Sequence, residues 1–279
     1  MSDVGDYLSG LNQLRKDNVS VFYSRGARGR ASYFSETANR SYLFLKEFFK
    51  SDIEIRVLVL DKDDWEKRRC PYPYGAAFSG KGCVHFPKDN DTPFIDMLMK
   101  ETEGFPEDQK ALLSTLVEDE DSALRTAFQR LIDLLIMHEM THAFCSKENV
   151  VFGQRWFNEF FAQYTSYAFL KRYESENPMD LKFWTILYNV CYEAGKPLVK
   201  HKSIEDFEEI FYDVGPLNYV WYQAKFVEGT KAVYDRYGEN FIDNVIEVFK
   251  VTPNTLVQRL EESCEGIRNW YTIWKKELE

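Results

Sequence analysis

The sequence has no apolar run that approaches the roughly 20 residues needed to cross a bilayer. Its start, MSDVGDYLSG, lacks the basic residues and the apolar stretch of a secretory signal. It also lacks an excess of positive charge, because 45 Asp and Glu against 35 Lys and Arg give a formal net charge of −10. These absences predict a cytoplasmic protein with neither a nucleic acid nor a membrane as partner, since both polyanionic surfaces select concentrated positive charge.

Cysteine and histidine are both scarce. The five cysteines are scattered, odd in number and without CxxC spacing, which favours free buried thiols in a reducing compartment. Of the four histidines, His85 and His201 stand alone and are expected to be structural or exposed. The chain also lacks repeats, low-complexity tracts and long Pro/Gly linkers, so we expect one unit over residues 1–279.

The N-terminal third mixes helix and strand patterns. Residues 35–50 carry apolar positions typical of an amphipathic helix, and residues 53–60 (IEIRVLVL) favour a strand. A short turn of helix is expected near Trp65, and residues 74–86 favour two strands around a Gly-rich turn. This part of the chain therefore predicts a small β-sheet lobe with helices.

From about Pro106 onward the sequence favours successive helices, with Gly and Pro residues as breaks. The candidates are residues 107–118, 122–147, 155–175, 179–194, 204–211, 217–237, 239–250, 254–263 and 265–277. The chain is thus predicted to be α+β, with a mixed lobe over residues 1–147 and an all-helical lobe over residues 148–279.

A candidate metal-binding motif stands at the end of the helix predicted from Ser122. It reads HEMTH, which places His138 and His142 four residues apart and Glu139 beside the first. At about 100° per residue, positions four apart share one helix face, so both imidazoles can reach one metal ion. Imidazole suits zinc, and a nearby carboxylate can take the proton of a zinc-bound water. A buried helix end with hydrogen-bonded histidines is the alternative.

A catalytic zinc needs a third protein ligand, and Glu159 is the candidate. It follows His142 with 159 − 142 − 1 = 16 residues between them, enough for a loop that lays a second helix beside the first. It stands in the apolar stretch RWFNEFFAQYTSY (residues 155–167), where a carboxylate is costly unless it is paired or bound to a cation. A Glu159 that faces the surface is the alternative.

HEMTH followed by WFNEFFAQY resembles the gluzincin clan of zinc peptidases, which carry HExxH and a downstream NE. These motifs are most similar to those of catalytic domains of leukotriene-hydrolase and alanyl-aminopeptidase type, which carry a W-x-NE-x-FA signature. The resemblance covers roughly residues 70–250. The signature is matched by Trp156, Asn158, Glu159, Phe161 and Ala162.

The resemblance implies both a fold and a site. The fold would be that of a thermolysin-like zincin catalytic domain, with the zinc cleft between the mixed lobe and the helical lobe. One zinc ion per chain would be held by His138, His142 and Glu159, and Glu139 would be the general base. The spacing to the third ligand is two residues shorter than in most such aminopeptidases, so a tighter connecting loop is expected.

The resemblance extends to the segment from Trp221, WYQAKFVEGTKAVYDRYGENFIDNVIEVF, which is similar to the family's tyrosine-containing helix pair. The tyrosine of that pair donates a hydrogen bond to the oxyanion of the tetrahedral intermediate. By position Tyr222 is the first candidate for this catalytic role and Tyr219 the second. In a chain with 17 Tyr, a plain core role for both is the alternative.

Residues 75–86 are similar to the edge strand with which substrate backbones pair in this clan. That similarity makes Gly75, Ala76 and Ala77 the substrate-binding candidates, with a plain hairpin as the alternative. The aminopeptidases carry GxMEN on this strand, and its Glu binds the substrate's α-amine. This chain has GAAFS and no acid there, which leaves the choice between aminopeptidase and endopeptidase open.

The sequence therefore predicts a zinc-dependent metallopeptidase, a hydrolase whose partner is a peptide or protein substrate. Two alternatives stay open. One is a catalytically silent peptide-binding module on a gluzincin scaffold, and the other is a zinc hydrolase of a non-peptide amide or ester, since the same zinc-bound water serves both reactions. The oligomeric state is not predicted.

Overall fold

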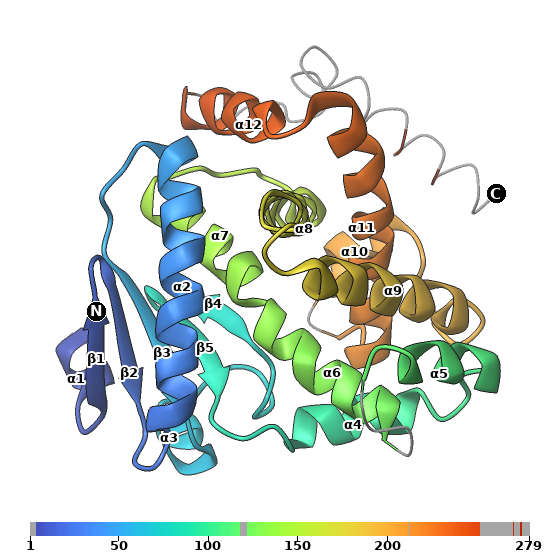
Figure 1. The fold of residues 1–279 in the computed structure, drawn as a ribbon, viewed down its shortest axis with the longest axis horizontal. Helices are drawn as coiled ribbons and strands as arrows, with labels where there is room; N and C mark the ends of the chain where they lie inside the picture. Colours follow the sequence, from blue (N-terminus) through green and yellow to red (C-terminus); the bar gives the residue numbers. More distant parts are fainter. Residues whose placement is uncertain (1–3, 118–121, 212, 252–269, 271–273, 275–279) are drawn as a thin grey trace. The chain divides into compact units, whose positions relative to one another are not determined.

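The computed structural model describes residues 4–117, 122–211, 213–251, Trp270 and Trp274 (Figure 1). Within these residues the protein is mixed α and β, with one five-stranded sheet and a majority of helix. The chain divides into two compact units. The sheet unit comprises residues 1–97 and 128–148, and the helical unit comprises residues 98–127 and 149–279. The middle of the sequence thus contributes a segment to each unit.

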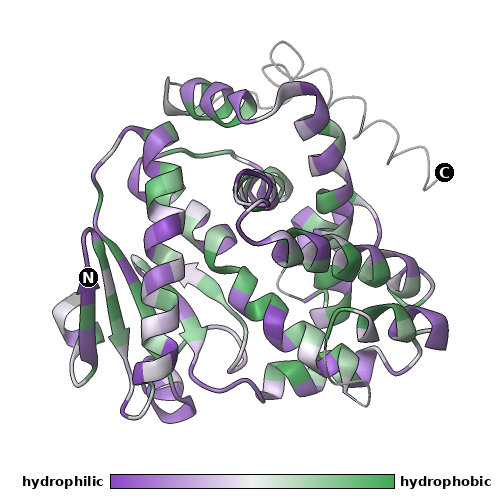
Figure 2. Cartoon of the chain, viewed as in Figure 1, coloured by the Kyte–Doolittle hydropathy of each residue, from purple (hydrophilic) through white to green (hydrophobic). Residues whose placement is uncertain are grey.

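The sheet has the strand order β1-β2-β3-β5-β4. Its strands are β1 (Asn12–Lys16), β2 (Val19–Tyr23), β3 (Ile55–Leu60), β4 (Phe78–Gly80) and β5 (Cys83–Pro87). The outer pairs β1–β2 and β5–β4 are antiparallel hairpins, whereas β2–β3 and β3–β5 are parallel. In Figure 2 the edge strand β1 is largely hydrophilic and the central β3 largely hydrophobic, as expected when only the central strand is covered on both faces.

Alternation along the strands sends side chains to two differently covered faces. Helix α2 (Arg28–Phe49) packs against β1, β2 and β3, and its Phe34 stacks on Phe86 of β5 with ring centroids 4.2 Å apart. The other face carries a cluster that includes side chains from the short helix α3 (Lys62–Lys67) and the partly buried Tyr7 of α1 (Val4–Leu8). Its buried members are Leu58, Leu60, Trp65, Tyr74, Phe78 and Cys83.

The helix that contains HEMTH is α7 (Ile136–Lys147), which packs against α2 and against β4 and β5. Its Phe144 meets the ring of Tyr42 at 5.5 Å and the ring of Phe49 at 5.2 Å. The single helix predicted over residues 122–147 is instead two helices, because Leu135 has a ψ of −5° and separates α6 (Ala123–Leu134) from α7. Helix α7 thus lies beside the β4 end of the sheet.

The N-terminal elements differ from those expected. Helix α2 begins at Arg28 rather than at residue 35, so the Gly-containing segment RGRAS belongs to the helix. The strand predicted at residues 53–60 begins at Ile55, and the helical turn near Trp65 is confirmed as α3. The β1–β2 hairpin and α4 (Pro93–Glu101) were not predicted.

The helical unit is formed by α5 (Glu107–Ser114), α8 (Arg155–Arg172), α9 (Pro178–Gly195), α10 (Ile204–Ile210), α11 (Pro216–Tyr237) and α12 (Asn240–Val251). Helix α11 packs against α8 and α9, α5 packs against α9, and α10 packs against α8. Pro178 and Pro216 stand in the first turns of α9 and α11, where the missing N–H has no intrahelical partner to lose. These elements confirm, to within a few residues, the helices predicted at residues 107–118, 155–175, 179–194, 204–211, 217–237 and 239–250.

The two helices predicted at residues 254–263 and 265–277 lie outside the described residues, apart from Trp270 and Trp274, which are buried. Trp270 packs so closely on Gly229 of α11 that a Cβ atom there would lie 2.4 Å from the indole ring. None of the described helices combines the length and the apolar composition that crossing a membrane requires.

Candidate metal centre

Helix α7 presents His138 and His142 to each other. Their Nε2 atoms lie 3.1 Å apart, with the ring centroids 4.7 Å apart and the planes at 83°. His138 is buried and His142 is half-buried. Two nitrogens bound to one tetrahedral zinc at about 2.0–2.1 Å would lie roughly 3.3 Å apart. The pair therefore has the spacing of two ligands of one ion.

Glu159 lies in the second turn of α8 and is 5% exposed, so it does not face the surface. Its Oε2 accepts hydrogen bonds from the hydroxyl of Tyr219 and from Nε2 of Gln223, both at 2.9 Å. Tyr219 and Gln223 are four residues apart on α11 and therefore share one face of that helix. Two donors on one oxygen stabilise the ionised carboxylate, which is the form that binds a metal ion.

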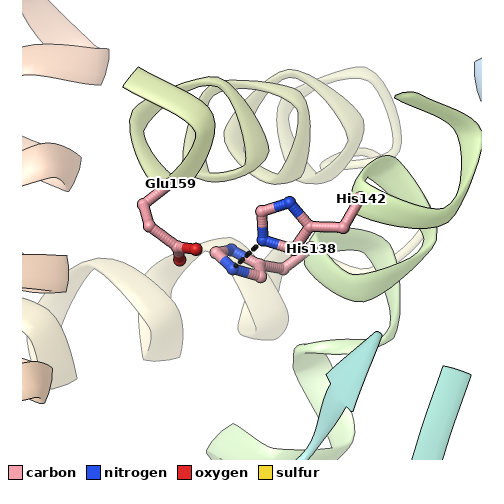
Figure 3. A group of neighbouring side chains, drawn as sticks. All are labelled: His138, His142 and Glu159. Carbon is pink, nitrogen blue, oxygen red and sulfur yellow. Dashed lines mark hydrogen bonds between the residues drawn. The ribbon is translucent and has the colours of Figure 1, made fainter. Parts of the chain in front are cut away.

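One ligand atom from each of His138, His142 and Glu159 lies within 4.8 Å of the others, and the group could hold a metal ion. Figure 3 shows the Glu159 carboxylate pointing toward the imidazole pair of α7. Two imidazoles and one carboxylate form a donor set that suits a divalent transition metal. The fold thus brings together the three residues that the sequence marked as metal ligands.

Glu139 belongs to the same turn of α7 as the two histidines and is 6% exposed. It stands three residues before His142, so the two side chains leave the helix on neighbouring faces. The Glu139 carboxylate is therefore largely removed from solvent and lies on the same turn as the two candidate ligands.

The two candidate tyrosines have different surroundings. Tyr222 is fully buried, and its hydroxyl donates to the Ser203 carbonyl at 2.9 Å. Burial raises the pKa of Tyr222, and the nearby acidic side chains of Asp206 and Glu205 raise it further. Tyr219 is half-buried and donates to Glu159. The structure thus places Tyr219, the second candidate from the sequence, next to a residue of the metal-ligand group.

The substrate-binding candidates Gly75, Ala76 and Ala77 precede β4 rather than lying on it, because the strand begins only at Phe78. Gly75 has a φ of +113°, and a Cβ atom there would lie 2.0 Å from Oγ1 of Thr92. This turn delays the start of the strand. The expected hairpin is otherwise confirmed, since β4 and β5 are joined by a two-residue turn.

The other two histidines lie outside this group. His85 has no exposure, stacks on Phe78 with centroids 4.1 Å apart, and has Nε2 2.9 Å from the Tyr7 hydroxyl. Burial lowers the pKa of His85 to about 3. His201 lies 3.7 Å from the Asp206 carboxylate and is half-buried. Both positions agree with the structural or exposed roles expected from the sequence.

The described cysteines are Cys70, Cys83, Cys145 and Cys191, and none of them forms a disulfide with another described residue. Burial raises the pKa of Cys83 to about 11 and that of Cys191 to about 12. Thiols with such pKa values stay protonated at neutral pH, so they are poor nucleophiles and poor metal ligands. Cys264 lies outside the described residues.

No protein-family model and no curated protein matches this chain. The resemblance to gluzincin peptidases is therefore a prediction carried by the HEMTH and NEFFA motifs. The burial of Glu159 and the proximity of the three ligand atoms are independent of that resemblance, because they come from the fold.

Gln223 is the residue beside this group that sequence analysis did not find. Gln223 stands four residues after Tyr219, which indicates that the two side chains share one face of the helix. The spacing does not indicate whether that face is turned toward Glu159. Packing of α11 against α8 and α9 decides that orientation.

Proposed function

We propose that this chain is a zinc-dependent metallopeptidase with a thermolysin-like fold, which hydrolyses peptide bonds in peptides or proteins. The observation that carries the proposal is the grouping of His138, His142 and Glu159, with ligand atoms within 4.8 Å of one another. Structural zinc sites are closed by four protein ligands, whereas catalytic sites use three and keep a position for water. Three ligands and an adjacent buried Glu139 therefore favour catalysis.

A bound zinc ion would lower the pKa of a coordinated water to about 7 and polarise the substrate carbonyl. Glu139 is the general base of this chain: it accepts a proton from the attacking water and then delivers it to the leaving amine. The position of Glu139 on the same turn as His138 and His142 suits this role. Its burial keeps competing water away from the proton that it holds.

Tyr219 is the proposed donor to the oxyanion. Its hydroxyl is 2.9 Å from Glu159, and the side chain is half-buried, so the hydrogen bond can be exchanged for one to a substrate oxygen. Tyr222 is excluded from this role in the proposal because its fully buried hydroxyl bonds Ser203. A donor aimed at the developing oxyanion is worth about 3 kcal/mol in the transition state.

Strand β4 is the proposed docking edge for the substrate backbone. It is the terminal strand of the sheet and packs beside α7, which contains His138 and His142. A terminal strand presents backbone N–H and C=O groups to which an extended peptide can pair. Because residues 75–79 (GAAFS) contain no acid, the proposal does not require a free N-terminus on the substrate.

The test compares bound metal and peptide hydrolysis in the wild type, in Glu139→Gln and in a control, Glu148→Gln. Glu148 ends the same helix and is hydrogen-bonded to Ser51. We expect one zinc ion per chain in all three proteins. Hydrolysis should persist in the control and fall about 100- to 10,000-fold in Glu139→Gln.

A protein that remains metal-free after growth in zinc-replete medium would contradict the metal site itself. Zinc-loaded protein that binds peptides tightly without cleaving them would support the peptide-binding module instead. Cleavage confined to esters or non-peptide amides would support the third function.

A further inference from the structure

A chain of buried amides leads from Glu159 into the interior of the helical unit. Nε2 of Gln223 donates to Glu159, and Oε1 of Gln223 accepts from Nε2 of Gln163 at 2.6 Å. The same Gln163 nitrogen lies 3.2 Å from the hydroxyl of Tyr188. Gln163 has no exposure, and Gln223 is 3% exposed. Water therefore does not compete for these hydrogen bonds.

The chemistry of the carboxylate fixes the direction of this chain. An ionised Glu159 only accepts hydrogen bonds, so Gln223 must turn its NH₂ group toward it. The Gln223 oxygen then faces Gln163 and requires a donor, which fixes the Gln163 amide as well. Both amides are thus oriented by their bonds, and the orientation of each supports that of the other.

Gln163 is not placed here for packing stability. Its Oε1 is buried and has no hydrogen-bond partner among the described residues, which makes the glutamine costly compared with an apolar side chain of similar size. What the glutamine does provide is the donor that anchors Gln223. Its contribution is therefore to the geometry at Glu159.

We propose that Gln223, oriented by Gln163, is a positioning residue that keeps Glu159 in place as a metal ligand while Tyr219 is released to the substrate. These two roles require one fixed donor and one exchangeable donor to Oε2 of Glu159, and the surroundings of the two side chains differ accordingly. Tyr219 is half-buried, whereas Gln223 is buried and held at its other end. The inference rests on the metal site of the proposed function but not on peptide hydrolysis.

The test measures zinc affinity by competition with a chelator, and thermal unfolding of the metal-free protein, in Gln223→Met and Gln163→Met. Loss of an outer partner of a metal ligand weakens binding about 10- to 100-fold, and we expect that loss in Gln223→Met and a smaller one in Gln163→Met. The melting temperature of metal-free Gln163→Met should stay close to that of the wild type, because the unpaired Oε1 of Gln163 is removed while the oxygen of Gln223 loses its donor.

Gln129→Met is the matched control. Gln129 also donates through Nε2 to a carboxylate, that of Asp91 at 2.8 Å, but in the sheet unit and outside the metal-ligand group. The zinc affinity of the Gln129→Met protein should equal that of the wild type. The double variant of Gln163 and Gln223 should bind zinc as Gln223→Met does, because Gln163 acts only through Gln223.

Unchanged zinc affinity in the folded Gln223→Met and Gln163→Met proteins would overturn the inference, as would a lowered melting temperature with unchanged affinity. If Gln223→Met does not fold, Gln163→Met decides alone. A wild type that binds no zinc would overturn both this inference and the proposed function. A wild type that binds zinc but cleaves no peptide overturns only the proposed function, and the affinities still test the role of Gln223.

Discussion

The sheet unit contains imidazole rings in two different settings: one ring is isolated in an apolar cluster, and two rings face each other on α7. His85 on β5 is stacked on Phe78, and its Nε2 atom is hydrogen-bonded to Tyr7. His138 and His142 on α7 instead bring two Nε2 atoms within 3.1 Å of each other. In the first case the ring is stacked on an aromatic side chain, and its Nε2 atom is paired with a hydroxyl. In the second the nitrogens converge, with a carboxylate within 4.8 Å, so convergence rather than burial marks the candidate site.

The surroundings of His85 also explain why it cannot serve as a ligand of this kind. Its ring is enclosed by the apolar cluster on the face of the sheet opposite α2, where desolvation lowers its pKa to about 3. The nearby Tyr7 has a raised pKa, mainly because burial disfavours the phenolate. Both groups therefore stay neutral near pH 7 and act as a hydrogen-bonded pair within the core.

The largest expected effect comes from exchanging the two kinds of histidine for alanine. In His142→Ala one proposed ligand is lost, so zinc affinity should fall by more than the roughly 100-fold that loss of an outer partner costs. In His85→Ala the stacked ring is lost, so the free energy of unfolding should fall by about 3 kcal/mol, as for other large core deletions. Chelator competition and urea denaturation of both variants measure the two effects.

The two histidine variants should have opposite profiles. His142→Ala is expected to keep most of the wild-type stability in the metal-free state, because His142 is half-buried. His85→Ala is expected to bind zinc as tightly as the wild type while folded. A loss of zinc binding in folded His85→Ala would show that the two regions are not independent and would break the comparison.

Tyr219 and Tyr222 give a second test of whether a residue acts at the candidate site or only in the core. Tyr219→Phe should lower kcat about 100-fold, since it removes a donor to the oxyanion. Tyr222→Phe should leave kcat unchanged and lower the free energy of unfolding by about 1 kcal/mol, since it removes a buried hydrogen bond to Ser203. Steady-state kinetics on a peptide substrate and urea denaturation separate the two. A 100-fold loss of kcat in Tyr222→Phe alone would reassign the donor.

Local patterns were enough to predict the elements whose own residues determine them. The apolar run of β3 and the spacing of HEMTH on α7 are examples. Strand β1 (NQLRK) has a single apolar residue and lacks the alternation that indicates a strand, so its sequence did not predict it. The two histidines of the candidate metal centre were identifiable because their spacing follows from helix geometry, and Glu159 because it is an acid within an apolar stretch.

The rest of the site depends on how α11 is turned. Tyr219 and Tyr222 are three residues apart and differ by only about 60° around the helix axis. Contacts with α8 and α9 select which of them meets Glu159, and these contacts are not encoded in the local sequence. Gln223 was missed for the same reason. Gly75 shows a further limit, since Thr92, which is seventeen residues away (92 − 75 = 17), leaves no room for a Cβ atom at this position.

The last expected effect is a pH dependence of the unfolding free energy that comes from His85. Its pKa is about 3 in the folded protein against about 6.5 for an ordinary histidine, so below pH 6.5 the unfolded chain binds a proton that the folded protein does not. Stability is therefore lost as pH falls, by about 2 kcal/mol between pH 6.5 and pH 5.

The variant that tests this pH dependence is His85→Phe, which keeps a stacked ring but cannot bind a proton. The control is His201→Gln, which removes a half-buried histidine. Relative to the wild type, His85→Phe should gain about 2 kcal/mol of unfolding free energy between pH 7 and pH 5 in urea denaturation, because the titrations common to both proteins cancel. Parallel pH profiles for the wild type and His85→Phe would mean that the buried ring accepts its proton as readily as an exposed one, and the contrast between the two histidine regions would then be one of geometry only.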